Sequence, residues 1–199
     1  FRVVDPIGKT EIKKVEVTVI DGGGRTLMPG LIESHVHLNF QHMIGGYETV
    51  EKRDWQEIGA MAAMAADSLL KDGFTTVRDC GTLQSGMRRA IDAGYANGPR
   101  IYNAGAVIGQ TSGHGDWRPI GYRTLQGRQN AKVAQLGMTF IVDGYDATLS
   151  ASRQNLANGS SFLKIMISGG IFSTKDPLHT VQMNEKEIGA VVEAADSWD

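Results

Sequence analysis

The chain has 199 residues, a formal net charge of −2 and a hydrophobic content of 41%, values typical of a soluble globular domain with its own core. Lys and Arg number 20 against 22 Asp and Glu, which argues against a nucleic-acid partner. No apolar run approaches the roughly 20 residues that span a bilayer, so we expect no membrane partner. The single cysteine, Cys80, excludes an internal disulfide framework. We expect a cytoplasmic protein, although a leader removed before Phe1 would also fit.

Short apolar or β-branched runs, several of them followed by glycine, indicate a series of buried strands. The expected strands are 15–20, 31–38, 74–79, 100–108 and 162–168. A long loop rich in Gly and Ser is expected from 109 to about 127, and loops of that length are usually functional or disordered.

Apolar residues at spacings of three and four indicate helices between these strands. Helices are expected from about 61 to a stop at Gly73, from 87 to 96, and from 147 to a stop at Asn158 and Gly159. A last helix should begin after Asn184, where Glu187 completes a capping box. The alternation of strands and helices predicts an α/β fold with a parallel sheet, and about four β/α units of a (β/α)8 barrel fit the chain.

Two histidines end the run 31–38. His35 and His37 are two residues apart, so in a strand both imidazoles point to one face. In a parallel barrel this end of the strand is where active sites form, and paired neutral imidazoles suit a divalent metal such as Zn²⁺. Two polar residues at a strand end without a ligand remain the alternative.

Lys164 lies inside the apolar run 162–167. Burial disfavours the charged amine and lowers its pKa, and a neutral amine can react with CO₂ to give a carbamate that bridges two metal ions. The alternatives are a lysine paired with a buried acid, or an amine that reaches water at an edge. With His35 and His37 in the same chain, a binuclear metal site is the better interpretation.

Three further positions near the same rim carry candidate chemistry. His114, flanked by Gly113 and Gly115, could polarise a substrate carbonyl or stabilise an oxyanion, or it could only brace its loop. Arg78 and Asp79 end the second strand, where a structural ion pair is at least as well supported as a catalytic role.

Together these segments resemble the amidohydrolase superfamily, and most of all its branch of imidazolonepropionase-like proteins and Xaa-Pro dipeptidases (prolidases). The resemblance lies in segments 27–38, 73–79, 111–116 and 162–170, which occur in the family's order. It implies a partial β-sandwich segment at 1–26, followed by the first four β/α units of a metal-dependent hydrolase barrel at 27–199. The second half of the barrel would come from missing sequence or from another chain.

The resemblance also implies a site. His35, His37 and an N6-carboxylated Lys164 would hold two divalent metal ions, expected to be zinc, and His114 would be catalytic. The implied reaction is hydrolysis of an amide or peptide bond by a metal-activated hydroxide. The substrate would be a small peptide or amide of the dipeptide, Xaa-Pro or N-acyl amino acid type, and Arg118 is a candidate to bind its carboxylate. We also expect a homo-oligomer.

Two other functions remain open on the sequence. One is a mononuclear deaminase or imidazolone-type cyclic amidohydrolase of the same superfamily, which Lys164 argues against because such sites lack the bridging lysine. The other is a non-catalytic amidohydrolase-like scaffold, which the presence of His35, His37 and Lys164 argues against.

Overall fold

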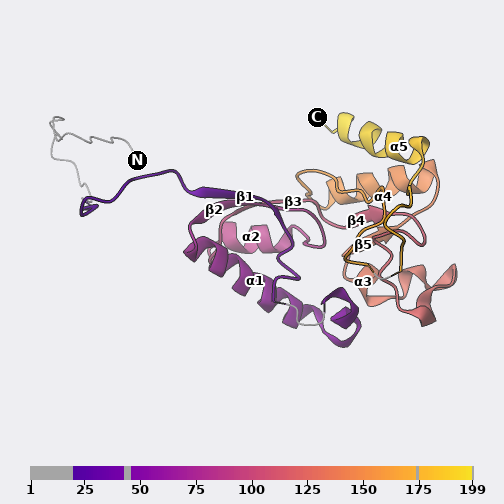
Figure 1. Cartoon of the computed structure of the whole chain (residues 1–199), viewed down its shortest axis with the longest axis horizontal. Coiled ribbons are helices and arrows are strands. Elements are labelled where there is room, and N and C mark those ends of the chain that lie inside the picture. Colours follow the sequence, from indigo (N-terminus) through magenta and orange to yellow (C-terminus); the bar gives the residue numbers. More distant parts are fainter. Residues whose placement is uncertain (1–19, 43–45, 174, 199) are drawn as a thin grey trace.

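The computed structural model describes residues 20–42, 46–173 and 175–198 (Figure 1). The expected strand at 15–20 and most of the expected β-sandwich segment at 1–26 therefore lie outside the described residues. Residues 20–26 are exposed and contain no strand.

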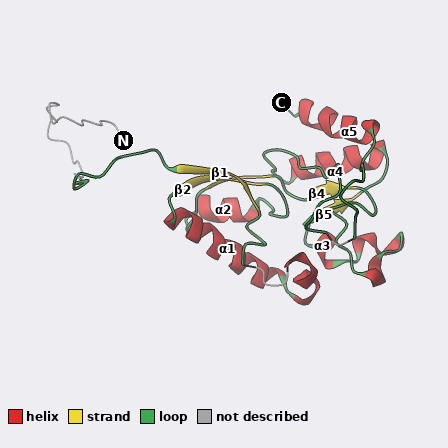
Figure 2. Cartoon of the chain, viewed as in Figure 1, coloured by secondary structure: helices red, strands yellow, loops and turns green. Residues whose placement is uncertain are grey.

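The expected strands at 31–38 and 74–79 are confirmed as strands, the first ending two residues early, but the expectation that 31–38 is buried is wrong, because within the described residues one edge of β1 has no neighbouring strand and most of its residues are exposed. β1 (Leu31–Val36), β2 (Phe74–Asp79) and β3 (Arg100–Asn103) form a parallel sheet in that order. Val36 pairs with Asp79, and Asp79 pairs with Asn103, so the carboxyl ends of all three strands lie at one edge. Figure 2 shows helices α1 and α2 packed on one side of this sheet.

α1 (Trp55–Lys71) connects β1 to β2, after a 3-10 turn η1 (Gly46–Lys52). Asp54 caps the helix by accepting the Glu57 N–H at 2.8 Å, and Gly73, with φ of 94°, follows its end as expected. The buried face consists of Ile58, Ala62, Ala65, Ala66 and Leu69. The small alanines let the helix approach the sheet closely, so they and Leu69 join one hydrophobic core with Val77 and Ile101, while Ile58 packs in another.

α2 (Gly86–Asp92) is shorter than the expected helix at 87–96. Gly94 has φ of 77° and donates its N–H to the Ile91 carbonyl at 2.9 Å. This left-handed residue ends the helix, because a right-handed helix cannot continue through it.

The prediction of a single strand at 100–108 is wrong. The chain instead forms β3 and a separate strand β4 (Val107–Gly109), which pairs with β5 (Thr139–Ile141). Gly105 lies between them with φ of 74°, and a Cβ there would fall 2.4 Å from Ser160 Oγ. The break is needed because the chain turns against a neighbouring segment in a conformation that glycine adopts readily.

The expected strand at 162–168 forms only isolated bridges. Ile165 pairs in parallel with Ile108, and Ser168 pairs antiparallel with Val181. The Met166 N–H donates to the Ile108 carbonyl oxygen, and the Ile108 N–H donates to the main-chain carbonyl oxygen of Lys164, both at 2.9 Å. The segment is therefore extended and aligned with β4 at one point, without a continuous ladder.

The segment expected to be one long loop at 109–127 contains short helical turns. These are η2 (Ile120–Tyr122), η3 (Gln126–Gln129) and, beyond the expected range, α3 (Lys132–Gln135). Val133 and Met138 from this region pack with Val107 and Trp117 in a second hydrophobic core.

The last two helices, α4 (Tyr145–Ala157) and α5 (Glu185–Asp196), lie side by side (Figure 1). The expected stop of α4 is confirmed, since Gly159 follows it with φ of 87°. The capping box is also confirmed: Asn184 Oδ1 accepts the Glu187 N–H at 3.1 Å, and the Asn184 N–H donates to Glu187 Oε2 at 2.8 Å.

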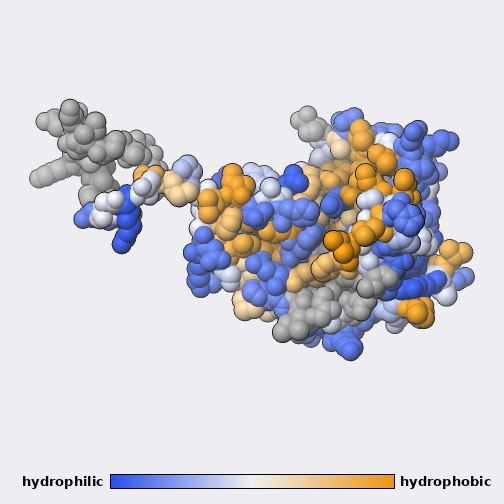
Figure 3. Space-filling view, in the orientation of Figure 1, coloured by the Kyte–Doolittle hydropathy of each residue, from blue (hydrophilic) through white to orange (hydrophobic). Residues whose placement is uncertain are grey.

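The fold is thus α/β with parallel strands, and large apolar side chains remain exposed on it. Figure 3 shows hydrophobic residues at the surface over β1 and beside α4 and α5. Ile32 is 70% exposed, and Ile171 and Val181 are each 89% exposed. Within the described residues, none of the helices has the length and apolar character required to cross a bilayer.

Candidate metal and catalytic site

Three of the four predicted site residues line one cavity of about 600 Å³ at the carboxyl end of β1. His35 and His37 come from the end of β1, and His114 comes from the loop after β4. The remaining wall includes the apolar side chains Phe40, Trp117, Met166 and Phe172. The cavity therefore combines a few polar groups with an apolar lining, as ligand sites commonly do.

His35 and His37 lie on the same side, as their spacing predicts. Their ring centroids are 5.3 Å apart with the rings at 66° to each other. His35 is exposed and His37 is half-buried. The Phe40 ring lies beside His37, with ring centroids 6.3 Å apart, and the Trp117 ring packs edge-on against Phe40 at 5.5 Å. One side of the histidine pair is thus held by aromatic rings.

The orientation of His37 is fixed by a main-chain contact. Its Nδ1 lies 3.2 Å from the Gly81 carbonyl oxygen, and a carbonyl can only accept, so Nδ1 carries the proton and Nε2 keeps its lone pair. Burial lowers the pKa of His37, the Gly81 hydrogen bond raises it, and the charges of His35 and Lys164 lower it; the net effect is a lowered pKa. A neutral imidazole with a free Nε2 is the form that binds metal.

Lys164 lies beside Gly81, the residue whose carbonyl contacts His37, and its charge acts on His37. A Cβ added to Gly81 would fall 3.8 Å from Lys164 Cγ and 2.4 Å from Val107 Cγ2. Lys164 is half-buried rather than buried, because residues 162–168 pair only at isolated positions. It does not line the cavity that contains the three histidines.

His35 and His37 suit a metal ion as two members of a larger ligand set. Among the described residues, no three His, Cys, Asp or Glu side chains form a group that could hold an ion. Two imidazoles supply nitrogen donors, and a carboxylated Lys164 would add an oxygen donor that such a set lacks. Nitrogen and oxygen donors together suit zinc.

His114 is held by two residues that the sequence did not point to. Its Nδ1 lies 3.2 Å from Asp176 Oδ2, and its main-chain N–H donates to Gln182 Oε1 at 2.7 Å. Gln182 also donates from Nε2 to Asp176 Oδ2 at 3.2 Å. Because a carboxylate only accepts, Nδ1 is the protonated nitrogen and Nε2 is left for a ligand.

Asp176 is buried, and its neighbours keep it ionised. Burial by itself raises the pKa of Asp176, but hydrogen bonds from Ser173, Gln182 and the Gly170 N–H, together with the charge of His114, lower it overall. Gly170 also allows the imidazole its position, because a Cβ there would fall 2.4 Å from His114 Cε1. Sequence reasoning missed Asp176 and Gln182 because they lie 62 and 68 residues from His114 in an irregular segment.

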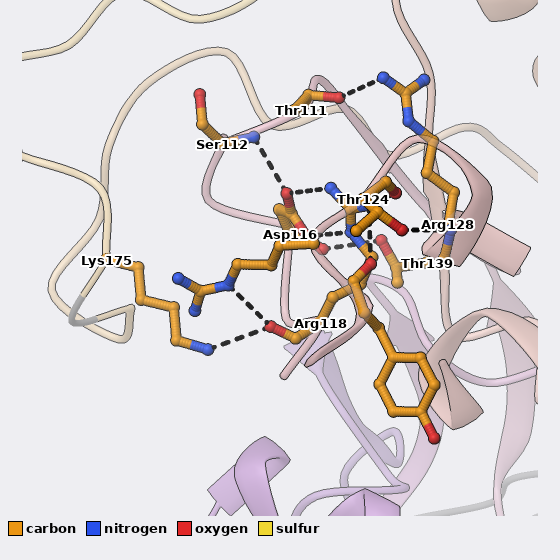
Figure 4. A network of polar contacts seen from close by, with 12 residues as sticks. Thr111, Ser112, Asp116, Arg118, Thr124, Arg128, Thr139 and Lys175 are labelled. Atoms are coloured by element: carbon orange, nitrogen blue, oxygen red, sulfur yellow. Dashed lines mark hydrogen bonds and ion pairs between the residues drawn. The ribbon is translucent and has the colours of Figure 1, made fainter. Parts of the chain in front are cut away.

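Arg118, proposed from the sequence to bind a substrate carboxylate, is already paired. Its Nε and Nη2 donate to the two carboxylate oxygens of Asp116, each at 2.7 Å, and Arg118 is only 2% exposed. Figure 4 shows this pair inside a polar network in which the Lys175 amine lies 3.4 Å from the Arg118 carbonyl oxygen. Arg118 therefore braces the loop that carries His114 and does not line the cavity of the three histidines, and its binding of a substrate carboxylate stays a prediction.

Arg78 and Asp79 do not pair with each other. The Arg78 guanidinium carbon lies 5.0 Å from the centre of the Phe162 ring, a cation–π arrangement. Asp79 turns to the opposite face of β2, is fully buried, and accepts main-chain N–H groups at the carboxyl ends of β1 and β2.

Comparison with known proteins agrees with this fold. The chain is 30% identical over 181 residues to ochratoxinase of Aspergillus niger, covering 85% of this chain and 36% of that protein. The crystal structure of a prolidase complexed with N-methylphosphonate-L-proline matches with a TM-score of 0.84 and 31% identity, covering 94% of this chain and 45% of that chain. The crystal structure of a Xaa-Pro dipeptidase with methionine bound in its active site matches with a TM-score of 0.69 and 31% identity, covering 85% of this chain and 41% of that chain.

Residues 26–199 match the Amidohydrolase family, and the chain belongs to that family. The resemblance inferred from the four sequence segments is thereby confirmed, including its structural neighbours among the prolidases. The chain spans about a third of the length of the curated relatives it matches and less than half of the solved chains.

Proposed function

We propose that this chain is part of a metal-dependent hydrolase that cleaves an amide or peptide bond in a small substrate. The observation that carries the proposal is the shared cavity of His35, His37 and His114, in which His114 is backed by the buried carboxylate of Asp176. Membership of the Amidohydrolase family supports hydrolysis as the reaction class. The names of the prolidase and ochratoxinase relatives favour a dipeptide, Xaa-Pro or N-acyl amino acid substrate.

In this proposal His35, His37 and an N6-carboxylated Lys164 hold two divalent metal ions, with zinc as the expected metal. Bound metal supplies Lewis-acid polarisation of the scissile carbonyl and makes water acidic enough to attack near neutral pH. The free Nε2 of His37 and the proximity of Lys164 to Gly81 support this ligand set.

His114 acts on the substrate carbonyl. Its Nδ1 contacts Asp176, and in the doubly protonated ring Nε2–H donates a hydrogen bond to the oxygen that becomes negative in the tetrahedral intermediate. Asp176 fixes the ring orientation, and the Gln182 side chain holds both the His114 main chain and the Asp176 carboxylate. The apolar walls Phe40 and Trp117 limit water around the reacting group.

The architecture we propose is the first four β/α units of a (β/α)8 barrel. Within the described residues β1 pairs only with β2, and Ile32, Ile171 and Val181 are exposed. Further strands, from the same chain or from a second chain, would cover these residues and supply the remaining metal ligands. Self-association into a homo-oligomer is also part of the proposal.

The test is metal content and hydrolysis by the full-length protein that carries this sequence. About two metal ions per chain, with hydrolysis of Xaa-Pro dipeptides, N-acyl amino acids or ochratoxin, would support the proposal. One ion per chain would favour a mononuclear deaminase or cyclic amidohydrolase instead. No metal and no hydrolysis would favour a scaffold.

The role of Lys164 is tested separately with Lys164→Met. Loss of the second metal ion and of activity is expected, because methionine cannot form a carbamate. Depleting CO₂ from metal-free wild-type protein before adding zinc should slow reactivation, and bicarbonate should restore it. The matched control is Lys186→Met, at an exposed position on α5, which should keep wild-type metal content. Full activity in Lys164→Met would contradict the binuclear site.

A further inference from the structure

Asp79 is a fully buried acid at the centre of the sheet edge that carries the candidate site. It ends β2, pairs with Val36 of β1 and with Asn103 of β3, and is 0% exposed. Oδ2 accepts the Leu38 N–H at 2.8 Å, and Oδ1 accepts the Gly81 N–H at 3.1 Å. One carboxylate thus links the turn after β1 to the turn after β2.

The two groups that Asp79 holds lie on either side of His37. Leu38 is the residue that follows it, so the bond to the Leu38 N–H fixes the main chain where His37 leaves β1. Gly81 supplies the carbonyl that lies 3.2 Å from His37 Nδ1. The same carboxylate therefore constrains both the backbone of His37 and the acceptor of its ring.

The Gly81 turn is held from its other side as well. Gly81 has φ of 128°, and a Cβ would fall 2.4 Å from Val107 Cγ2, so the turn requires glycine. Thr82 donates its N–H to the Gly105 carbonyl at 2.8 Å, and Asn39 Nδ2 donates to the Thr82 carbonyl at 2.7 Å. The Gly81 carbonyl shares its peptide plane with the Thr82 N–H, which Gly105 holds, and Asp79 holds the preceding peptide plane through the Gly81 N–H, so the two bonds together fix the turn that carries the carbonyl.

We propose that Asp79 is a positioning residue for His37, which it holds in the Nδ1–H tautomer with Nε2 open to the cavity. As a positioning role toward a metal ligand, this rests on the proposed function. Burial raises the pKa of Asp79 to about 7, against the lowering effect of the N–H groups of Leu38, Gly81 and Leu83. The Asp79 carboxylate is nevertheless needed there, because without it the N–H groups of Leu38 and Gly81 would be buried without a hydrogen-bond acceptor.

The first experiment is ¹⁵N NMR of histidine side chains in the metal-free, full-length protein. In the wild type, His37, assigned through a His37→Gln variant, should show a protonated Nδ1 and an unprotonated Nε2. In Asp79→Asn the amide cannot accept two N–H groups through two oxygens, so His37 should become a mixture of tautomers. A wild-type His37 with its proton on Nε2 would overturn the proposal without any Asp79 variant.

The second experiment is zinc affinity measured by competition with a chromogenic chelator. Residues that orient a metal-binding imidazole typically change affinity by about 10- to 100-fold, so Asp79→Asn should weaken zinc binding in that range. Asp92→Asn, at an exposed position of α2, is the control and should bind as the wild type does. Wild-type affinity together with an unchanged His37 tautomer in Asp79→Asn would overturn the positioning role.

The two proposals fail in different ways. If the wild type binds no zinc, the proposed function fails, and the tautomer of His37 still decides whether Asp79 orients the ring. If the wild type binds zinc and Asp79→Asn matches it in both measurements, only the positioning role fails. Should Asp79→Asn not fold, Asp79→Glu replaces it: the carboxylate is displaced by one methylene, and the same two changes are expected.

Discussion

The Nδ1 atom of His114 lies 3.2 Å from Oδ2 of Asp176, a buried carboxylate from a segment 62 residues further along the chain. This contact gives His114 one protonated nitrogen of known position and leaves Nε2 for a ligand. The contribution of Asp176 to the rate of hydrolysis can therefore be measured separately from that of His114.

Asp176→Asn should lower kcat of the full-length hydrolase and leave KM nearly unchanged. The amide can present its NH₂ group to Nδ1 instead of a carboxylate oxygen, so the ring loses its fixed orientation and the hydrogen bond to the developing oxyanion weakens. Removing an oxyanion donor outright costs on the order of 100- to 1000-fold in kcat, and weakening one should cost up to about 100-fold. Steady-state kinetics on an Xaa-Pro or N-acyl substrate measures the effect.

The control for this change is Asp146→Asn, at an exposed position in the first turn of α4. It should leave kcat unchanged. Equal kcat for Asp176→Asn and the wild type would show that Asp176 only braces the loop.

Gly170→Ala should impair the site more than the fold. The added Cβ would fall 2.4 Å from His114 Cε1, so the imidazole must move away from Asp176. Overpacking of this kind costs about 1–3 kcal/mol in unfolding free energy, and kcat should fall as it does for Asp176→Asn. Gly189→Ala on α5, where a Cβ would meet nothing within 4 Å, should be neutral or slightly stabilising. A Gly170→Ala protein with unaltered kcat would contradict the close packing of His114.

Asp116→Asn should destabilise the protein near neutral pH, because it leaves the Arg118 guanidinium buried and unpaired. Breaking a buried pair in this way costs about 3–5 kcal/mol. Urea unfolding at pH 7 measures the loss. Asp143→Asn, which breaks the more exposed pair between Asp143 and Arg128, should cost no more than about 1 kcal/mol.

The same pair predicts a pH dependence. Burial alone raises the pKa of Asp116, but the hydrogen bonds from Arg118 and the Ser112 N–H outweigh it, and the pKa lies below the ordinary 3.8. A carboxyl with a lowered folded-state pKa stabilises the fold above its unfolded pKa and loses this contribution as pH falls through the folded value. The stability gap between wild type and Asp116→Asn should be largest above about pH 5 and should close toward acid. A gap that is constant from pH 7 to pH 3 would contradict this.

Asn184→Ala should destabilise the start of α5 by about 1 kcal/mol. The Asn184 side chain accepts the N–H groups of Lys186 and Glu187 at 3.0 and 3.1 Å. Glu187 also accepts the Gly144 N–H at 2.7 Å, so the loss should reach the start of α4. Faster amide hydrogen exchange at both helix starts measures it. Asn158→Ala, after the end of α4, should leave α5 exchange unchanged.

The sequence determined the features that depend on neighbouring residues. β1 and β2 follow from short runs with apolar or β-branched residues, Gly73 and Gly159 end helices where they stand, and Asn184 and Glu187 form the expected capping box. The spacing of His35 and His37 placed both rings on one side. These are local effects, set by side-chain alternation, backbone dihedrals and contacts within one helical turn.

Only the tertiary structure decided the relationships between distant segments. The break at Gly105, the incomplete pairing around Lys164, the Asp116–Arg118 pair and the approach of Asp176 to His114 were not visible in the sequence. Each depends on how separate segments pack, and a buried charge or a strand end has no local periodicity that would reveal its partner. The sequence therefore pointed to the histidines and the lysine, while packing decided which residues orient them.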